Sequence, residues 1–242
     1  MLLIEISGKN GLGKTHGVEL APKELLKGSS YSFYKKINPN NGDIEEQENQ
    51  ILEQSKDLMT KKPFFIGGDH SISYPLVKNF IKTHKNAGIV VLDAHPDLMP
   101  PMENPTHEEW LAAVIELGFN PKNILLIGAR NIDPEEEKHS VNKIKISELN
   151  NCQEKLNTFL KDKQIYLSMD IDFFDSSIAS ATGYPEKDGA TESQGLTLIK
   201  QIIQNGNVCA ADLVEVNPTK QNPEKTIALA KKIINLVLKE NK

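Results

Sequence analysis

The segment GIVVLDAHPD, residues 88–97, decides the fold, because a buried strand in it leads directly into a cluster of polar residues. The apolar run up to residue 93 is continuous rather than alternating, which is typical of a strand buried on both faces of a parallel sheet. Longer amphipathic stretches separate it from similar runs, so the sequence predicts an α/β fold with helices on both sides of a mostly parallel sheet. The predicted strands cover residues 2–7, 64–67, 88–93, 123–128, 141–146, 165–170 and 208–214.

The composition is that of an ordinary globular protein and argues against several classes of function. Of the 242 residues, 38% are hydrophobic and 25% charged, and without a convincing linker one domain over residues 1–242 is expected. The formal net charge of −5 argues against a broad electrostatic contact with nucleic acid. No apolar run is long enough for a membrane helix, and the start lacks the pattern of a signal peptide, so we expect a cytoplasmic protein. Cys152 and Cys209 are too few for a disulfide framework and are expected to be structural.

Polar residues gather directly after four of the predicted strands. The segments are FIGGDHS at residues 65–71, VVLDAHPD at 90–97, LSMDID at 167–172 and DLVEVNP at 212–218. Ligands of parallel α/β sheets bind at the carboxyl ends of the strands. We therefore expect the functional site to be built from these segments.

The spacing of the acidic and histidine residues in these segments points to a metal site. In an extended chain, the Asp-x-His-x-Asp pattern of residues 93–97 would place three polar side chains on one face, and residues 170–172 would repeat this geometry. Carboxylates this close repel one another unless a cation lies between them. Carboxylate and imidazole together suit manganese, iron or zinc, and six ligands are too many for one metal that also holds water, so two metals and metal-assisted hydrolysis are expected. The candidate metal ligands are His70, Asp93, His95, Asp97, Asp170 and Asp172.

Taken together, these motifs resemble the ureohydrolase (arginase/agmatinase) family over most of the chain. The resemblance rests on GGDHS, DAHPD, SMDID and EVNP in this order, with GVELAP at residues 17–22 and ATG at 181–183. It implies a three-layer α/β/α sandwich with two Mn²⁺ ions, although other divalent metals would also suit the ligands. It further implies hydrolysis of a small guanidino substrate to urea and an amine by a metal-bridging hydroxide, in a homo-oligomer, either a trimer or a hexamer.

The resemblance also assigns roles to individual residues. His70, Asp93, Asp97 and Asp170 would hold one metal, and Asp93, His95, Asp170 and Asp172 the other, so that Asp93 and Asp170 bridge the pair. The expected catalytic residues are Asp97, Glu215 and His107. Glu215 would face the guanidinium, a planar cation that a carboxylate can bind through two hydrogen bonds.

His107 would act as the proton shuttle, a task that suits an imidazole titrating near neutrality. It lies between Thr106 and Glu109, which form a predicted capping box for a helix over residues 110–117. Family members commonly have a small residue where this chain has Glu108.

Departures from the family pattern bear on the substrate. The loop over residues 98–105 is shorter and more apolar than the arginase loop that holds the amino-acid head group, which favours agmatine or another guanidino compound over arginine. Asn131 and Asp133 are expected to bind substrate, but the family has acids at both positions, so Asn131 weakens the recognition of a second amine. Residues 135–137, three glutamates, are expected to be a solvated helix start.

Two other functions remain open. The segment GKNGLGKT, residues 8–15, matches the phosphate-loop pattern of nucleotide hydrolases, but Gly17 and Pro22 would interrupt the helix that such a loop needs. Alternatively, Glu108 and Asn131 would be consistent with a protein that binds metal without turnover. The segment 38–50 is polar and is expected to begin as a loop.

Overall fold

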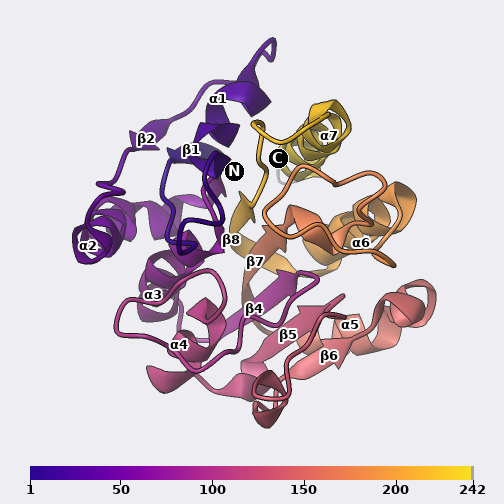
Figure 1. Cartoon of the computed structure of the whole chain (residues 1–242). Coiled ribbons are helices and arrows are strands. Elements are labelled where there is room, and N and C mark those ends of the chain that lie inside the picture. The colour runs from indigo at the N-terminus through magenta and orange to yellow at the C-terminus, as the bar shows by residue number, and fades with distance from the viewer. Residues whose placement is uncertain (241–242) are drawn as a thin grey trace.

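A parallel eight-stranded sheet forms the centre of the computed structural model, which describes residues 1–240 (Figure 1). The strand order is β2-β1-β3-β8-β7-β4-β5-β6, and every neighbouring pair is parallel. The strands are β1 (Leu2–Ile6), β2 (Lys35–Ile37), β3 (Pro63–Ile66), β4 (Ala87–Leu92), β5 (Ile124–Ile127), β6 (Asn142–Ile144), β7 (Gln164–Asp170) and β8 (Asn207–Val214).

Helices cover both faces of this sheet, so the predicted three-layer α/β/α sandwich is confirmed (Figure 1). Within β4, Val90 and Leu92 pack toward the helices of one face, whereas Ile89 and Val91 pack toward those of the other. This alternation explains why the strand is a continuous apolar run. The first face carries α1 (Ala21–Leu26), α5 (Gln153–Leu160), α6 (Glu192–Asn205) and α7 (Glu224–Glu240), and the second carries α2 (Ile44–Ser55), α3 (Ser73–Thr83) and α4 (Trp110–Glu116).

The register of the four central strands brings the polar segments together. The strands β3, β8, β7 and β4 are consecutive in the sheet. Near their carboxyl ends, Leu213 pairs with Ile66, and Met169 pairs with both Leu213 and Leu92. The residues that follow these strands therefore emerge side by side, along the carboxyl ends of the central strands.

The sequence did not predict β2, and its physical character explains the omission. This strand has three residues, two of which are lysines, and it pairs only with β1 at the edge of the sheet. A short, charged edge strand lacks the apolar run by which the other strands are recognised. The loop expected at the start of residues 38–50 gives way at Ile44 to α2, whose N-cap Asp43 accepts a hydrogen bond from the Glu46 amide at 3.0 Å.

The capping box predicted at Thr106 and Glu109 is wrong as a helix start. The helix α4 begins at Trp110, and its N-cap, Glu109, makes no side-chain cap hydrogen bond. Instead, the Thr106 hydroxyl donates to the Glu109 carboxylate, and both side chains are buried. His107 therefore lies in a turn before the helix rather than in its first turn.

Cys152 and Cys209 are buried free thiols, as expected for structural cysteines. Within residues 1–240, no helix combines the length and the apolar character needed to cross a membrane.

Gly68 has a positive φ of 82° in the turn that follows β3, and a Cβ placed there would lie 2.5 Å from the carbonyl oxygen of Gly8. We expect Gly68→Ala to lower the free energy of unfolding by about 2–4 kcal/mol, because it combines left-handed strain with a backbone clash. Gly13 is a matched control, since its φ is 80° but a Cβ placed there would have no neighbour within 4 Å. Gly13→Ala should cost only about 1–2 kcal/mol, the strain alone. Equal losses in urea unfolding of the two variants would contradict this account.

Candidate functional site

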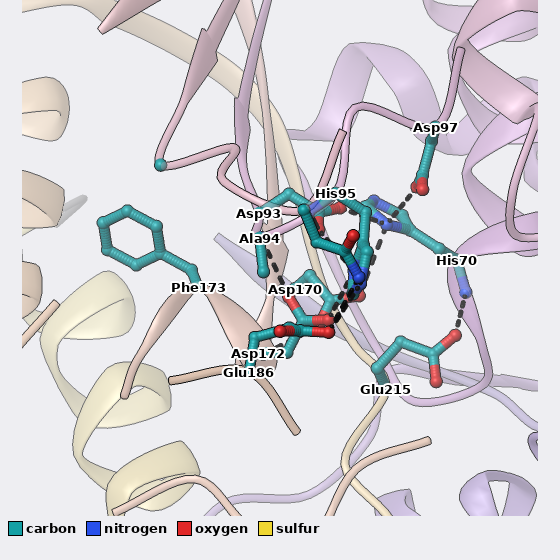
Figure 2. Close-up of polar contacts among 12 residues, drawn as sticks. His70, Asp93, Ala94, His95, Asp97, Asp170, Asp172, Phe173, Glu186 and Glu215 are labelled. Atoms are coloured by element: carbon teal, nitrogen blue, oxygen red, sulfur yellow. Dashed lines mark hydrogen bonds and ion pairs between the residues drawn. The ribbon is translucent and has the colours of Figure 1, made fainter. Parts of the chain in front are cut away.

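His70 forms the centre of a first group of buried polar side chains. Gly67 and Gly68, with φ of 97° and 82°, turn the chain after β3 into a short 3₁₀ helix, His70–Ile72. His70 Nδ1 lies 2.9 Å from Asp93 Oδ2, 2.9 Å from Asp97 Oδ2 and 3.4 Å from Asp170 Oδ2. Figure 2 shows Asp93, Asp97 and Asp170 around the His70 ring.

A second group shares Asp93 with the first. His95 Nδ1 lies 2.9 Å from Asp172 Oδ2 and 3.6 Å from Asp93 Oδ1 (Figure 2). The ligand atoms of His70, Asp93 and Asp97, and those of Asp93, His95 and Asp172, are each close enough together to hold a metal ion. The structure thus brings all six candidate ligands together, with Asp93 between the two histidines.

The prediction that residues 93–97 leave the sheet on one extended face is wrong. The strand β4 ends at Leu92, and Asp97 has a left-handed φ of 53°. Asp97 therefore joins His70, whereas His95 faces Asp172. Asp172 is likewise not extended, because it lies in the 3₁₀ helix Ile171–Phe173, where its amide donates to Asp170 Oδ1 at 2.8 Å.

Hydrogen bonds to residues outside the two groups fix the orientation of these side chains. His70 Nε2 lies 2.9 Å from the Ser168 hydroxyl, which donates to Asp212 Oδ1 at 2.7 Å. The indole of Trp110 donates to Asp97 Oδ2 at 2.7 Å. Ser168 and Asp212 lie within the polar segments, but nothing in their spacing distinguished them from strand residues that merely face the core.

Burial and mutual repulsion shift the pKa values of these groups. Burial, together with the charge of Asp93, raises the pKa of Asp97 to about 7. Burial and neighbouring carboxylates raise the pKa values of Asp170 and Asp172 as well. Burial opposes charge on His70, but the surrounding carboxylates outweigh it and raise the pKa of its imidazole. The site therefore holds protons near neutrality that a cation would displace.

Two buried atoms show that a metal ion fits this site. His70 Nδ1 and Asp93 Oδ2 have no hydrogen-bond partner among the described residues, although they lie 2.9 Å apart. Buried polar atoms are nearly always hydrogen-bonded, so an unpaired nitrogen and oxygen aimed at the same point call for a further ligand. Imidazole and carboxylate donors suit a divalent cation of the manganese, iron or zinc kind.

Glu215 lies beside the metal-binding groups and has one free carboxylate oxygen. Its backbone has a left-handed φ of 64°, and its amide donates to the Gly68 carbonyl at 3.0 Å. Oε1 accepts from the His70 amide at 2.9 Å, as Figure 2 shows, whereas buried Oε2 has no hydrogen-bond partner within residues 1–240. Burial and the charge of Asp69 raise the pKa of this carboxyl group.

His107 is buried and lines a cavity next to the two groups of candidate ligands. Neither ring nitrogen has a hydrogen-bond partner in the described part of the chain, and Nε2 lies 3.6 Å from Glu108 Oε1. Its ring stacks on Tyr184, with 5.6 Å between the centroids. Burial lowers the pKa of His107, so the ring is neutral at neutral pH. Tyr184 follows the ATG motif, but nothing in the sequence marked it as a site residue.

The proposed substrate residues also lie at this cavity, which has a volume of about 250 Å³. Asn131 and Asp133 both line it. Glu136 was expected to be solvated, and this is wrong: its buried carboxylate accepts hydrogen bonds from the Leu98 amide at 3.1 Å and the Asp133 amide at 2.8 Å. The full lining comprises His70, His95, Asp97, Met99, His107, Glu108, Asn131, Asp133, Glu136, Asp170, Asp172, Thr182, Tyr184 and Glu215.

The segment over residues 8–15 does not form a phosphate loop. It is followed by turns and the 3₁₀ helix Val18–Leu20 rather than by a helix starting at Lys14. This confirms the prediction that the chain around Gly17 does not continue as the helix that a phosphate loop needs. The Asn10 amide and the Thr15 hydroxyl both donate to Asp69 Oδ2 at 2.7 Å. A carboxylate of the protein thus occupies a backbone amide that would have to contact a phosphate and a hydroxyl that would have to bind Mg²⁺.

Comparisons with known proteins agree with this geometry. A model of the Arginase family matches residues 11–239. The agmatinase of Bacillus subtilis (strain 168) is 32% identical over 202 residues, which cover 81% of this chain and 67% of that protein. The hepatic arginase of Aquarana catesbeiana is 31% identical over 191 residues, which cover 66% of this chain and 59% of that protein.

A solved structure shows the same fold at lower sequence identity. The formimidoylglutamase of Bacillus subtilis superposes with a TM-score of 0.89 at 22% identity, covering 99% of this chain and 86% of that one. The family model spans nearly the whole chain, and the fold agrees with it. The chain therefore belongs to the arginase family.

Proposed function

We propose that this protein is a binuclear manganese hydrolase that cleaves a guanidino group to urea and an amine. The observation that carries the proposal is the pair of ligand groups sharing Asp93, with the free Oε2 of Glu215 beside them. A guanidinium bound at Glu215 would present its carbon toward the metal-binding groups. Among the described carboxylates that line the cavity, only Glu215 has a buried oxygen without a hydrogen-bond partner.

The metal pair would be held by the six ligands that the structure brings together. His70, Asp97 and Asp170 lie on one side of Asp93, and His95 and Asp172 lie on the other. When bound, two divalent cations lower the pKa of water toward neutrality and so supply a nucleophile without a side-chain attack.

Glu215 and His107 then account for the remaining steps. The fixed Oε1 of Glu215 leaves Oε2 to accept from the guanidinium, which orients the planar cation and compensates for the burial of the carboxylate. A neutral imidazole at His107 accepts a proton and passes it to the leaving amine. Its unpartnered ring nitrogens leave it available for this transfer.

The charge of the cavity favours agmatine-like substrates over arginine. Away from the metal ligands, the lining carries the carboxylates of Glu108, Asp133 and Glu136, and no lysine or arginine lines the described cavity. An amine at the far end of the substrate would meet these acids, whereas a carboxylate would be repelled by them. Asn131 also lines this part of the cavity but carries no charge. Of the two positions expected to bind substrate, only Asp133 can therefore pair with an amine.

The pH dependence of metal binding tests the metal centre. In the unfolded chain Asp97 ionises near pH 4, but in the folded, metal-free protein its pKa is about 7. That raised pKa stabilises the metal-free fold at low pH, and this stabilisation is lost as the pH rises through 7. Mn²⁺ must displace the same protons, so calorimetry should show proton release, and the metal-induced rise in Tm should be larger at pH 8 than at pH 6. An equal rise at both pH values would contradict the assignment.

A substrate panel tests the reaction. The manganese-loaded protein is incubated with agmatine, arginine, 4-guanidinobutyrate and formiminoglutamate, and urea, formamide and ammonia are measured. We expect urea as the product and the highest kcat/KM for agmatine. Of the four compounds, only agmatine carries an amine and no carboxylate at the end away from the reacting group, so only agmatine avoids repulsion by the acidic lining. Manganese uptake with no product from any compound would instead support a protein that binds metal without turnover.

Variants separate this activity from nucleotide hydrolysis. Lys14→Ala should leave most of the urea production intact, because Lys14 is an exposed residue paired with Glu108 at 3.5 Å. Loss of an ATPase activity in Lys14→Ala would favour the phosphate-loop alternative. Asp170→Asn should abolish turnover, and full activity in this variant would overturn the metal assignment.

Glu215→Gln tests the guanidinium contact. Loss of one charge-assisted hydrogen bond is worth about 1.5–3 kcal/mol, so kcat/KM should fall by roughly 10- to 100-fold. Manganese affinity should stay unchanged, because Glu215 is not a proposed ligand. A fall in metal affinity with unaltered kinetics at saturating metal would show that Glu215 belongs to the metal site instead.

A further inference from the structure

Glu186 contacts His95 from the side opposite to the metal-binding groups. His95 Nδ1 faces Asp172 at 2.9 Å, whereas Nε2 lies 3.5 Å from Glu186 Oε1. Glu186 also lies close to Asn131, whose side-chain amide donates to the same Oε1 at 2.9 Å. Figure 2 labels Glu186 and Asp172, the two acidic residues that contact the His95 ring.

The chemistry of the His95 ring requires an acceptor at Nε2. If Nδ1 binds a metal, it carries no proton, so the neutral ring must carry its proton on Nε2. Metal-binding histidines almost always donate this second N–H to a carboxylate, a carbonyl or water. Glu186 Oε1 is the carboxylate oxygen that faces Nε2.

Asn131 holds this acceptor in place and does not replace it. Asn131 Nδ2 lies 3.4 Å from His95 Nε2. An amide nitrogen is only a donor, so it cannot accept a proton from Nε2. Turning the amide over would direct its oxygen toward His95, but also toward the Glu186 carboxylate, which it now binds as a donor. Asn131 therefore serves as a donor to the negatively charged Glu186 carboxylate, which is left as the acceptor for His95.

The backbone of Glu186 is fixed although its side chain reaches the surface. The side chain is 29% exposed, but the Glu186 carbonyl accepts hydrogen bonds from the Ser176 amide at 2.9 Å and from Arg130 Nη2 at 3.2 Å. Arg130 Nη2 also donates to the Asp172 carbonyl at 2.9 Å. The guanidinium thus ties the loop of Glu186 to the segment that carries the metal-binding Asp172.

We propose that Glu186 is a positioning residue of the metal centre, which accepts the Nε2 proton of His95 and so directs Nδ1 toward the metal. Asn131 orients the Glu186 carboxylate for this task. This inference rests on the proposed metal function, and it concerns only the ion held by His95, Asp93 and Asp172.

The test measures the affinity of the two metal sites separately. Glu186→Gln removes the charge but keeps the shape, and its affinity for one of two Mn²⁺ ions should fall about 10-fold or more in calorimetry, while the other ion binds as in the wild type. The electron paramagnetic resonance signal of a coupled manganese pair should accordingly weaken at low metal concentration. Asn131→Asp in the Glu186→Gln background should restore the affinity, because the new carboxylate faces Nε2.

Matched measurements distinguish this role from a structural one. Glu137→Gln, which removes the charge of an exposed glutamate elsewhere in the chain, should leave both affinities unchanged. Wild-type affinity of both ions in Glu186→Gln, or an equal fall at both sites accompanied by a lower Tm of the metal-free protein, would overturn the proposal. If the wild type itself binds fewer than two ions, the proposed metal function fails instead.

Discussion

The concentration of buried negative charge at one edge of the sheet is the constraint on which the rest of the structure depends. Four aspartates are buried here, and each lies within contact distance of His70 or His95. They are Asp93, Asp97, Asp170 and Asp172. In the metal-free protein this charge is partly neutralised by protons, which is why burial and repulsion raise three of the four carboxyl pKa values. Asp93 is the exception: burial opposes its ionisation, but contacts with His70 and His95 lower its pKa. Asp93 is thus the ionised carboxylate that the two groups of candidate ligands share.

The parallel sheet makes this concentration possible, and the turns after its strands complete it. Four adjacent strands end at the same edge, so residues about 150 positions apart in the chain meet without long connections. Positive φ values at Gly67, Gly68, Asp97 and Glu215 then redirect the chain where each side chain must turn inward. Such backbone conformations are costly for residues other than glycine, and they occur here at two of the proposed functional residues.

A fold does not by itself identify a substrate, so the side chains around the candidate metal ligands carry that information. Proteins named arginase and agmatinase are similar to this chain in sequence, and a formimidoylglutamase shares its fold, so the fold leaves the substrate open. The local features of this chain that bear on the substrate are the acidic lining near Asp133 and Glu136, the pairing of Glu186 with Asn131, and Lys14 beside Glu108. The segment that imitates a phosphate loop supplies Lys14 and is fixed to Asp69, next to His70.

The sequence by itself determined the fold class, seven of the eight strands and the identity of the six candidate metal ligands, because buried parallel strands are continuous apolar runs and the ligands follow them directly. It could not reveal the edge strand β2, whose lysines give no apolar signal, or the turn that separates Asp97 from His95. Only the tertiary structure decided that Glu136 is buried, that His107 lies in a turn against Tyr184, and that Glu186 meets His95. The physical reason is that a local pattern records which residues a strand or helix must bury. Contacts between loops depend instead on how distant segments pack, and a loop glutamate such as Glu186 carries no periodic signal of its partner.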